Sequence, residues 1–180
     1  YAYARSDKKD APRISIGGRL VADLIAVSGA TRVVTMGLHA EQVHGFFSLP
    51  VDHLSALPVL ADHFKATMSL DNAVVVSPDF GNAKAAGAFA RRLGVGLAAG
   101  SKRRLADDKV VIDTIVGDVA GRDVIVLDDE IATGGSIVEL IEKVKEYGVN
   151  SIRVACTHGL FSGRAPERIN ACADIVEIVT

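Results

Sequence analysis

Residues 124–136 combine two kinds of chemistry that oppose each other. The apolar run VIVL ends in two adjacent carboxylates, Asp128 and Asp129, and the stretch TGGS (133–136) follows closely. Carboxylates repel phosphate, whereas a glycine-rich loop that opens a helix binds phosphate through its backbone N–H groups. The acids suit vicinal hydroxyls or a divalent cation. The pattern therefore predicts a sugar phosphate site.

A purely structural explanation of the same stretch is an acidic turn followed by a helix start that Ser136 helps to cap. Gly134 and Gly135 favour the ligand site, because glycine lets the main chain approach a phosphate and adopt dihedrals barred to other residues. A second charged stretch, SKRRLADDK (101–109), offers Lys102 and Arg104 as further phosphate contacts. On its own, such a run is more often a solvated loop between strands.

Apolar runs of strand length alternate with helix-like patterns along the chain. Strands are expected at residues 31–36, 73–78, 95–99, 110–116, 123–129, 151–158 and 173–180. Helices are expected at 18–29, 82–94 and 135–148, the last two ending on glycines that suit a left-handed cap. This alternation predicts βαβ units and a mostly parallel sheet, with ligands at the carboxyl ends of its strands. The stretch 50–72 is expected to connect two halves.

Composition narrows the class of protein. The chain has 180 residues, of which 49% are hydrophobic, enough for one good-sized core or two small ones. Its net charge of −2 argues against nucleic acid as a partner. Two cysteines are too few for a disulfide framework or a zinc site and indicate reduced thiols. Without a run of transmembrane length or a signal-peptide pattern, a cytoplasmic location without membrane contact is expected.

Several segments resemble one family in the order of the chain. The stretch GLHAEQVHGFFSLPVD (37–52) closely resembles the signature of the ribose-phosphate diphosphokinase (phosphoribosyl pyrophosphate synthetase) family. Residues 3–13 resemble its ATP-contacting segment, residues 77–84 its metal-binding turn and residues 101–104 its basic loop. Residues 157–163 resemble a further family segment, and residues 124–136 resemble its sugar phosphate loop. An ordinary phosphoribosyltransferase would share only the last of these.

The resemblance implies an α/β fold of two phosphoribosyltransferase-like halves with mostly parallel sheets flanked by helices. Residues 1–58 would be the remainder of a truncated first half, and residues 59–180 the second half with the ribose 5-phosphate loop. The implied reaction transfers a diphosphoryl group from ATP to the anomeric hydroxyl of ribose 5-phosphate. It gives phosphoribosyl diphosphate and AMP for nucleotide biosynthesis, with Mg²⁺ as cofactor. A homo-oligomer is expected, because the family builds its ATP site partly from a neighbouring subunit.

The same resemblance assigns roles by position. Lys102 and Arg104 match the catalytic basic loop, and His39 and Asp79 match the metal ligands. The implied ATP contacts are Arg5, Ser6, Asp7 and His39. The implied ribose 5-phosphate contacts are Asp128, Asp129, Ala132, Thr133, Gly134, Gly135 and Ser136.

Four positions depart from the family pattern: Gly37 and Ala132 stand where aspartate is usual, Ser6 replaces glutamine, and Ser48 replaces a frequent acid. These departures leave two alternatives open beside an active enzyme. One is a non-catalytic regulatory homologue that binds active relatives. The other is a nucleobase phosphoribosyltransferase.

Overall fold

The computed structural model describes residues 1, 3–9, 11–106 and 109–180, without the side chains of 103–110. The chain forms two compact units, Tyr1–Ala56 and Leu57–Thr180, and each is described by itself. Their boundary lies close to the division expected after residue 58. The assignment of both units as phosphoribosyltransferase-like halves stays a prediction.

The first unit is small and contains a helix, a 3-10 helix and two strands. Its elements are α1 (Gly17–Val27), β1 (Val33–Met36), η1 (Glu41–Phe46) and β2 (Val51–Leu54). The two strands pair in parallel, with Val33 opposite Val51. Ala22 and Val43 are fully buried and form its core together with the buried Leu38 and Phe47.

A six-stranded sheet forms the centre of the second unit, in the order β5-β4-β3-β6-β7-β8. The strands are β3 (Ala73–Ser77), β4 (Gly96–Ala106), β5 (Lys109–Val116), β6 (Asp123–Ile131), β7 (Ser151–Gly159) and β8 (Ile175–Val179). β5 runs antiparallel to β4, and the other neighbouring strands are parallel. The α/β fold with a mostly parallel sheet is therefore confirmed.

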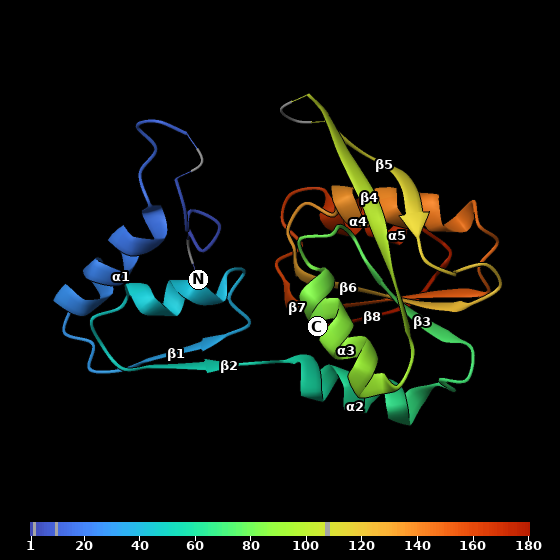
Figure 1. The fold of residues 1–180 in the computed structure, drawn as a ribbon, viewed down its shortest axis with the longest axis horizontal. Coiled ribbons are helices and arrows are strands. Elements are labelled where there is room, and N and C mark those ends of the chain that lie inside the picture. Colours follow the sequence, from blue (N-terminus) through green and yellow to red (C-terminus); the bar gives the residue numbers. More distant parts are fainter. Residues whose placement is uncertain (2, 10, 107–108) are drawn as a thin grey trace. The chain divides into compact units, whose positions relative to one another are not determined.

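Helices cover both faces of this sheet (Figure 1). They are α2 (Leu57–Thr67), α3 (Ala83–Leu93), α4 (Gly135–Lys145) and α5 (Ala165–Asn170). α4 and α5 pack on the face that carries Val74 and Val76, and α2 and α3 cover the other face. Because both faces are buried, β3 and the first part of β6 consist of continuous apolar runs.

Two expectations about the elements need correction. The stretch 50–72 is not a plain connection, since it contains β2 and most of its remainder forms α2. Pro58 lies in the first turn of α2, where a missing N–H costs nothing. Leu60 and Phe64 are buried, and the Phe64 ring contacts Phe89 of α3. α3 ends on the left-handed Gly94 as expected, whereas α4 ends at Lys145, before Gly148.

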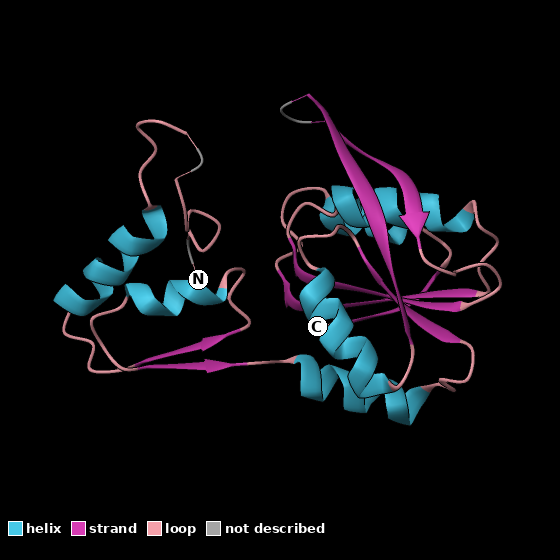
Figure 2. Cartoon of the chain, in the orientation of Figure 1, coloured by secondary structure: helices cyan, strands magenta, loops and turns pink. Residues whose placement is uncertain are grey.

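The antiparallel pair β4–β5 is a long hairpin that projects past the ends of the neighbouring strands (Figure 2). It lies at the edge of the sheet, because β5 pairs with β4 alone among the described strands. The hairpin is longer than the sequence indicated: β4 continues from the expected strand at 95–99 through the charged stretch to Ala106. The basic residues at 102–104 are thus strand residues rather than part of an irregular loop.

Candidate active site

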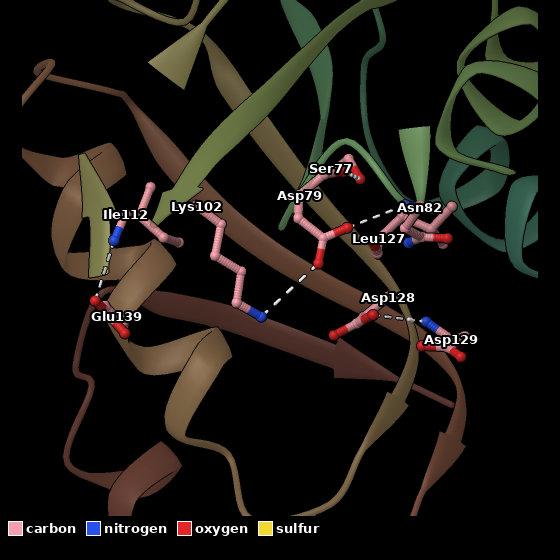
Figure 3. Close-up of polar contacts among 9 residues, drawn as sticks. All are labelled: Ser77, Asp79, Asn82, Lys102, Ile112, Leu127, Asp128, Asp129 and Glu139. Atoms are coloured by element: carbon pink, nitrogen blue, oxygen red, sulfur yellow. Dashed lines mark hydrogen bonds and ion pairs between the residues drawn. The ribbon is translucent and has the colours of Figure 1, made fainter. Parts of the chain in front are cut away.

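Polar residues gather near the carboxyl-terminal ends of three neighbouring strands, β3, β4 and β6 (Figure 3). Asp79 follows β3 by two residues, Lys102 lies on β4, and the pair Asp128–Asp129 lies near the end of β6. β3 is paired with both β4 and β6, so these segments are adjacent in the sheet. The structure thereby brings together four of the residues predicted from the sequence.

The turn after β3 holds Asp79 in place. Ser77 Oγ donates to the Asp79 carbonyl at 2.7 Å, and the Asn82 amide donates to Asp79 Oδ1 at 3.1 Å. A Cβ at Gly81 would lie 3.0 Å from the same oxygen, so this position favours glycine. The other carboxylate oxygen, Oδ2, lies 3.8 Å from Lys102 Nζ. Asp79 therefore presents one oxygen to a cationic group.

Asn82 is a site residue that the sequence did not single out. Its side-chain amide donates to the Leu127 carbonyl at 2.9 Å, and its backbone amide holds Asp79. Asn82 thus ties the turn after β3 to the residue immediately before the acid pair on β6. Only its place in an Asp-x-x-Asn helix start could have indicated it.

The acid pair does not end its strand, contrary to the expectation from the sequence. β6 continues to Ile131 because it keeps pairing with β7, where Ile131 lies opposite Gly159. Asp128 lies opposite the buried Cys156, and one of its oxygens accepts the Asp129 amide at 2.9 Å. Asp128 consequently lies on the same face of the sheet as Cys156, which is the face covered by α4 and α5.

Burial raises the pKa of Asp128 well above its usual range, and the neighbouring Asp129 and then Asp79 raise it further. The same burial, together with Asp128, raises the pKa of the Cys156 thiol to about 11. Three carboxylates in a partly buried setting are unfavourable unless cations or hydroxyl donors offset them. Lys102 provides part of that compensation from 3.8 Å, and the remaining excess suits a divalent cation or a sugar.

The loop between β6 and α4 is held by its carbonyl groups. The Ile131 carbonyl accepts from the amides of Leu160 and Phe161, both at 3.1 Å. The Ala132 carbonyl accepts from the Ser162 amide at 2.9 Å and from its hydroxyl at 3.2 Å. The Thr133 carbonyl accepts from Arg168 Nη1 at 3.1 Å. Three successive carbonyls thus point toward the segment 160–168.

This anchoring determines where the loop amides point. In a trans peptide the N–H points opposite to the preceding carbonyl, and no cis peptide occurs in the part of the chain that is described. The amides of Ala132, Thr133 and Gly134 therefore face away from the segment 160–168. Gly134 precedes α4 with φ 75° and ψ −4°, and the first-turn amides of α4 have no intrahelical acceptor. Together these amides are oriented as the predicted anion site requires.

The side chains of the loop add little to this anion site beyond two hydroxyls. Thr133 and Ser136 are exposed, whereas Gly134 is buried. Ala132 contributes its backbone, which is the part of the residue that the anchoring uses. The anchoring segment 160–168 overlaps the family-like stretch 157–163, but its contacts with the loop were not predicted, because they come from tertiary packing.

The predicted ATP contacts lie in the first unit. The Leu38 amide donates to His53 Nε2 at 3.1 Å, which fixes the backbone immediately before His39. Asp7 accepts from Gln42 Nε2 at 2.8 Å. The Ser6 hydroxyl accepts the Gly17 amide at 2.9 Å and donates to the Ser15 carbonyl at 3.2 Å, so it helps to hold the start of α1. The roles of His39 and Asp79 as metal ligands stay predictions, each within its own unit.

Three further observations concern Arg104, metal ligands and membrane helices. Arg104 lies on β4 opposite Val110, but its side chain is outside the described part of the structure, so its role stays a prediction. Among the described residues, no group of three or more His, Cys, Asp and Glu side chains is arranged to hold a metal ion. Within the same residues, no helix has the length and apolar character that a membrane span requires.

Known sequences give a consistent assignment. Residues 102–180 match the family described as phosphoribosyl synthetase-associated domain. A Streptomyces coelicolor protein, named provisionally as a ribose-phosphate pyrophosphokinase, is 62% identical over 99% of this chain. The ribose-phosphate pyrophosphokinase of Deinococcus radiodurans is 52% identical over 100% of it. The chain spans 56% of the length of each of these relatives.

Solved structures agree with the sequences. The crystal structure of phosphoribosylpyrophosphate synthetase from Mycobacterium smegmatis aligns with a TM-score of 0.89 and 36% identity, over 99% of this chain and 64% of that one. A purine phosphoribosyltransferase from Pyrococcus horikoshii aligns with a TM-score of 0.51 and 23% identity, over 69% of this chain and 80% of its own; that likeness shows the fold alone. In sequence and in fold, the chain belongs to the ribose-phosphate pyrophosphokinase (diphosphokinase) family.

Proposed function

We propose that the protein transfers the diphosphoryl group of ATP to the anomeric hydroxyl of ribose 5-phosphate, giving phosphoribosyl diphosphate and AMP. The observation that carries this proposal is the arrangement of charged and polar groups near the carboxyl-terminal ends of β3, β4 and β6. A loop whose amides are oriented for an anion follows the acid pair on β6, and Lys102 on the β4–β5 hairpin lies 3.8 Å from Asp79, the third acid of the site. Membership in a family whose relatives carry the name of this activity supports the proposal.

The sugar substrate fits the segment from Asp128 to Ser136. The loop amides would hold the 5-phosphate, because its charge matches the helix start and the N–H groups of residues 132–134. Asp128 and Asp129 would accept hydrogen bonds from the sugar hydroxyls. Such bonds would also relieve the crowding that raises the pKa of Asp128. The sugar hydroxyls would thus compensate for the unfavourable charge of Asp128 and Asp129, while the loop amides hold the 5-phosphate.

The diphosphoryl donor fits the side of the site that carries Asp79 and Lys102. Lys102 would contact the transferring phosphates, and Arg104 would do so as well. The excess of carboxylates fits Mg²⁺, which prefers oxygen ligands; when bound, it neutralises phosphate charge. We propose Asp79 as a ligand for it in the second unit, and His39 stays a predicted metal ligand of the first unit. We retain Arg5 and Asp7 as ATP contacts, whereas the engaged hydroxyl of Ser6 favours a structural role.

The decisive experiment measures AMP formation by the whole protein from ATP, with and without ribose 5-phosphate and Mg²⁺. We expect AMP and phosphoribosyl diphosphate in equal amounts, and only when all three components are present. ADP in place of AMP would indicate transfer of a single phosphoryl group and would contradict the proposal. In parallel, light scattering should show a homo-oligomer at micromolar concentration.

Ala132 supports a second candidate function, that of a non-catalytic homologue. It stands where the resemblance leads us to expect an aspartate, and the non-catalytic homologue would account for that substitution. Such a protein would bind ribose 5-phosphate without forming AMP. The nucleobase phosphoribosyltransferase is tested separately by diphosphate release from phosphoribosyl diphosphate with purines or pyrimidines, which we expect to be absent.

A further inference from the structure

Side chains of helix α4 and of the turn that follows it fasten the edge strand β5. The Ile112 amide donates to Glu139 Oε1 at 3.1 Å, and the Ile115 amide donates to the Tyr147 hydroxyl at 3.2 Å. The same hydroxyl lies 3.0 Å from Thr114 Oγ1. Among the described residues β5 pairs with one strand only, so Glu139 of α4 and Tyr147 of the following turn supply acceptors that a further strand would otherwise provide. Of the two acceptors, the Glu139 carboxylate carries a charge, whereas the Tyr147 hydroxyl is neutral.

The two fastened amides are three residues apart because the hairpin contains a bulge. Ser101 lies opposite Thr114 and Lys102 lies opposite Ile112, so Asp113 is the extra residue. In a regular strand, amides two residues apart point to the same side; one inserted residue increases this spacing to three. The bulge adjoins the cross-strand partner of Lys102. It thereby affects the direction in which the lysine leaves the hairpin.

Ile112, the cross-strand partner of Lys102, is held in place by burial in the core. Its side chain is 4% exposed and belongs to the core cluster with Ile137 and Leu140 of α4. Side chains of directly opposed residues lie on the same face of a sheet, so Lys102 leaves the hairpin on the face that Ile112 buries. From there it reaches toward Asp79 (Figure 3). The position of Ile112 therefore determines the reach of the lysine.

We propose that Glu139 is a positioning residue for Lys102. By accepting the Ile112 amide, its carboxylate fixes the bulge opposite the lysine and holds the hairpin at a set distance from α4. The same helix begins at Gly135, in the proposed 5-phosphate site. One rigid helix thus links the group that binds the sugar phosphate to the strand that carries the cation for the transferring phosphates. This inference rests on the proposed function and adds a residue to it.

Tyr147 provides a matched comparison, because it makes the same kind of contact farther from the lysine. Its partner Ile115 lies opposite Gly100, which has no side chain to position. If α4 only stabilises the edge of the sheet, then removal of either contact should have the same consequences. If Glu139 positions Lys102, its loss should affect turnover, whereas loss of the Tyr147 hydroxyl should affect only stability.

The test compares Glu139→Ala, Glu139→Gln and Tyr147→Phe in the whole protein. Glutamine keeps the Oε1 acceptor, whereas alanine removes it. We expect Glu139→Ala to lower kcat by about 10–100-fold with less than about threefold change in KM for ribose 5-phosphate, since misplacement by about 1 Å can cost that much in rate. Glu139→Gln and Tyr147→Phe should stay within about threefold of the wild-type kcat.

A double variant identifies the residue through which Glu139 acts. In a Lys102→Ala background, Glu139→Ala should cause no further loss of kcat, because the group that it positions is already gone. A full additional loss in that background would overturn the assignment. Equal losses of kcat in Glu139→Ala and Tyr147→Phe would overturn it as well, since they would indicate general stabilisation of the edge strand.

Amide hydrogen exchange supplies a readout that does not depend on turnover. Exchange in residues 111–116 should accelerate in Glu139→Ala, and it should stay near the wild-type rate in Glu139→Gln. Unchanged exchange in Glu139→Ala would overturn the inference even if the proposed function holds. Absence of AMP formation in every variant, the wild type included, would instead overturn the proposed function and with it the role of Glu139 in turnover.

Discussion

The β6–α4 loop and the β4–β5 hairpin both present groups suited to phosphate, but they are built from different parts of the chain. The loop is held by three successive carbonyls, at Ile131, Ala132 and Thr133, and presents backbone amides. The hairpin presents a long side chain, Lys102, whose contact with Asp79 spans 3.8 Å with both side chains partly exposed. Exposed ion pairs of this kind contribute little to stability.

This difference predicts opposite sensitivities to substitution. Where backbone N–H groups bind the ligand, a new side chain matters little unless it changes the dihedrals. Where a cationic side chain acts on transferring phosphates, its loss removes the interaction itself. The acids on β6 lie between these extremes, because they act through side chains whose charge the fold disfavours. The variants below test this comparison, beginning with the largest expected effect.

Lys102→Ala should have the largest effect on rate. Removing one electrostatic contact to the transferring group typically costs about 10²–10³ in rate, so kcat should fall far more than KM for ribose 5-phosphate rises. Steady-state AMP formation measures both constants. Lys65→Ala, at an exposed position in the last turn of α2, is the control and should match the wild type. If Lys102→Ala also matches the wild type, Lys102 is a solvated strand residue.

Asp128→Asn should weaken binding of ribose 5-phosphate and leave binding of ATP nearly unchanged. The expected loss is roughly 1.5–3 kcal/mol for each charge-assisted hydrogen bond to a sugar hydroxyl. Calorimetric titration of each substrate in turn separates the two affinities. A collapse of ATP affinity with intact sugar affinity would reverse the assignment: the acid pair would then serve the metal of the nucleotide.

Gly134→Ala should destabilise the protein through its backbone. Gly134 has φ 75°, while an added Cβ would meet only ordinary contacts at 3.5 Å. The cost is therefore the left-handed conformation, about 1–2 kcal/mol for a residue with a side chain. Gly135→Ala is the matched control, since Gly135 is the first residue of α4 and an added Cβ has 3.8 Å of space. Thermal unfolding of both variants should show a loss only in the first.

Asp128→Asn should also stabilise the ligand-free protein near neutral pH. Burial and the neighbouring acids raise the pKa of Asp128 in the folded protein, so the folded state binds its proton more tightly than the unfolded state. The favourable contribution of Asp128 is then complete below pH of about 3.9 and disappears as pH rises through the raised pKa. Asparagine carries no charge and avoids this loss.

The stability test measures denaturant unfolding of wild type and Asp128→Asn without magnesium. The variant should gain at least about 1.4 kcal/mol at pH 8, the equivalent of one pKa unit, and the gain should shrink toward pH 4. Asp62→Asn, at an exposed position of α2, serves as control and should show no such trend. A constant difference across this range would mean that Asp128 is not crowded in the folded protein.

Periodicity predicted the elements best where burial alone decides the structure. The apolar runs of β3 and β6 are buried on both faces, so their positions follow from composition. α2 was missed because Pro58 resembled a break, although a proline in the first helical turn is compatible with the helix. The length of β6 was underestimated because its last residues are held in the sheet by pairing with β7, which local sequence does not reveal.

The candidate site divides in the same way. Asp79, Lys102 and Asp128 were identified because their types and order match a known pattern, and the fold brings them together. Glu139 was not, since its contact with Ile112 joins residues 27 positions apart and depends on the bulge in the hairpin. Contacts that orient a functional side chain are products of tertiary packing. They become visible only once the strands are in register.

Ala132→Asp should have the smallest effect, because the proposed binding at this position uses the backbone. The Ile131 carbonyl is held by the amides of Leu160 and Phe161, so the Ala132 amide points toward the proposed anion site whichever side chain the residue carries. An introduced carboxylate would have to turn away from the phosphate dianion, toward the amides of the loop or a sugar hydroxyl. KM for ribose 5-phosphate should therefore change by less than about tenfold, or roughly 1.4 kcal/mol.

Steady-state kinetics on both proteins at saturating ATP and magnesium measures this effect. Similar turnover in wild type and Ala132→Asp would agree with a loop that binds through its amides and with a fully active natural alanine. The informative contrary result is a wild type without turnover that Ala132→Asp restores to substantial activity. An acid at this position would then be essential to the chemistry, and the natural protein would be the non-catalytic homologue. The loop would in that case bind phosphate through its backbone yet lack one side chain that the reaction needs.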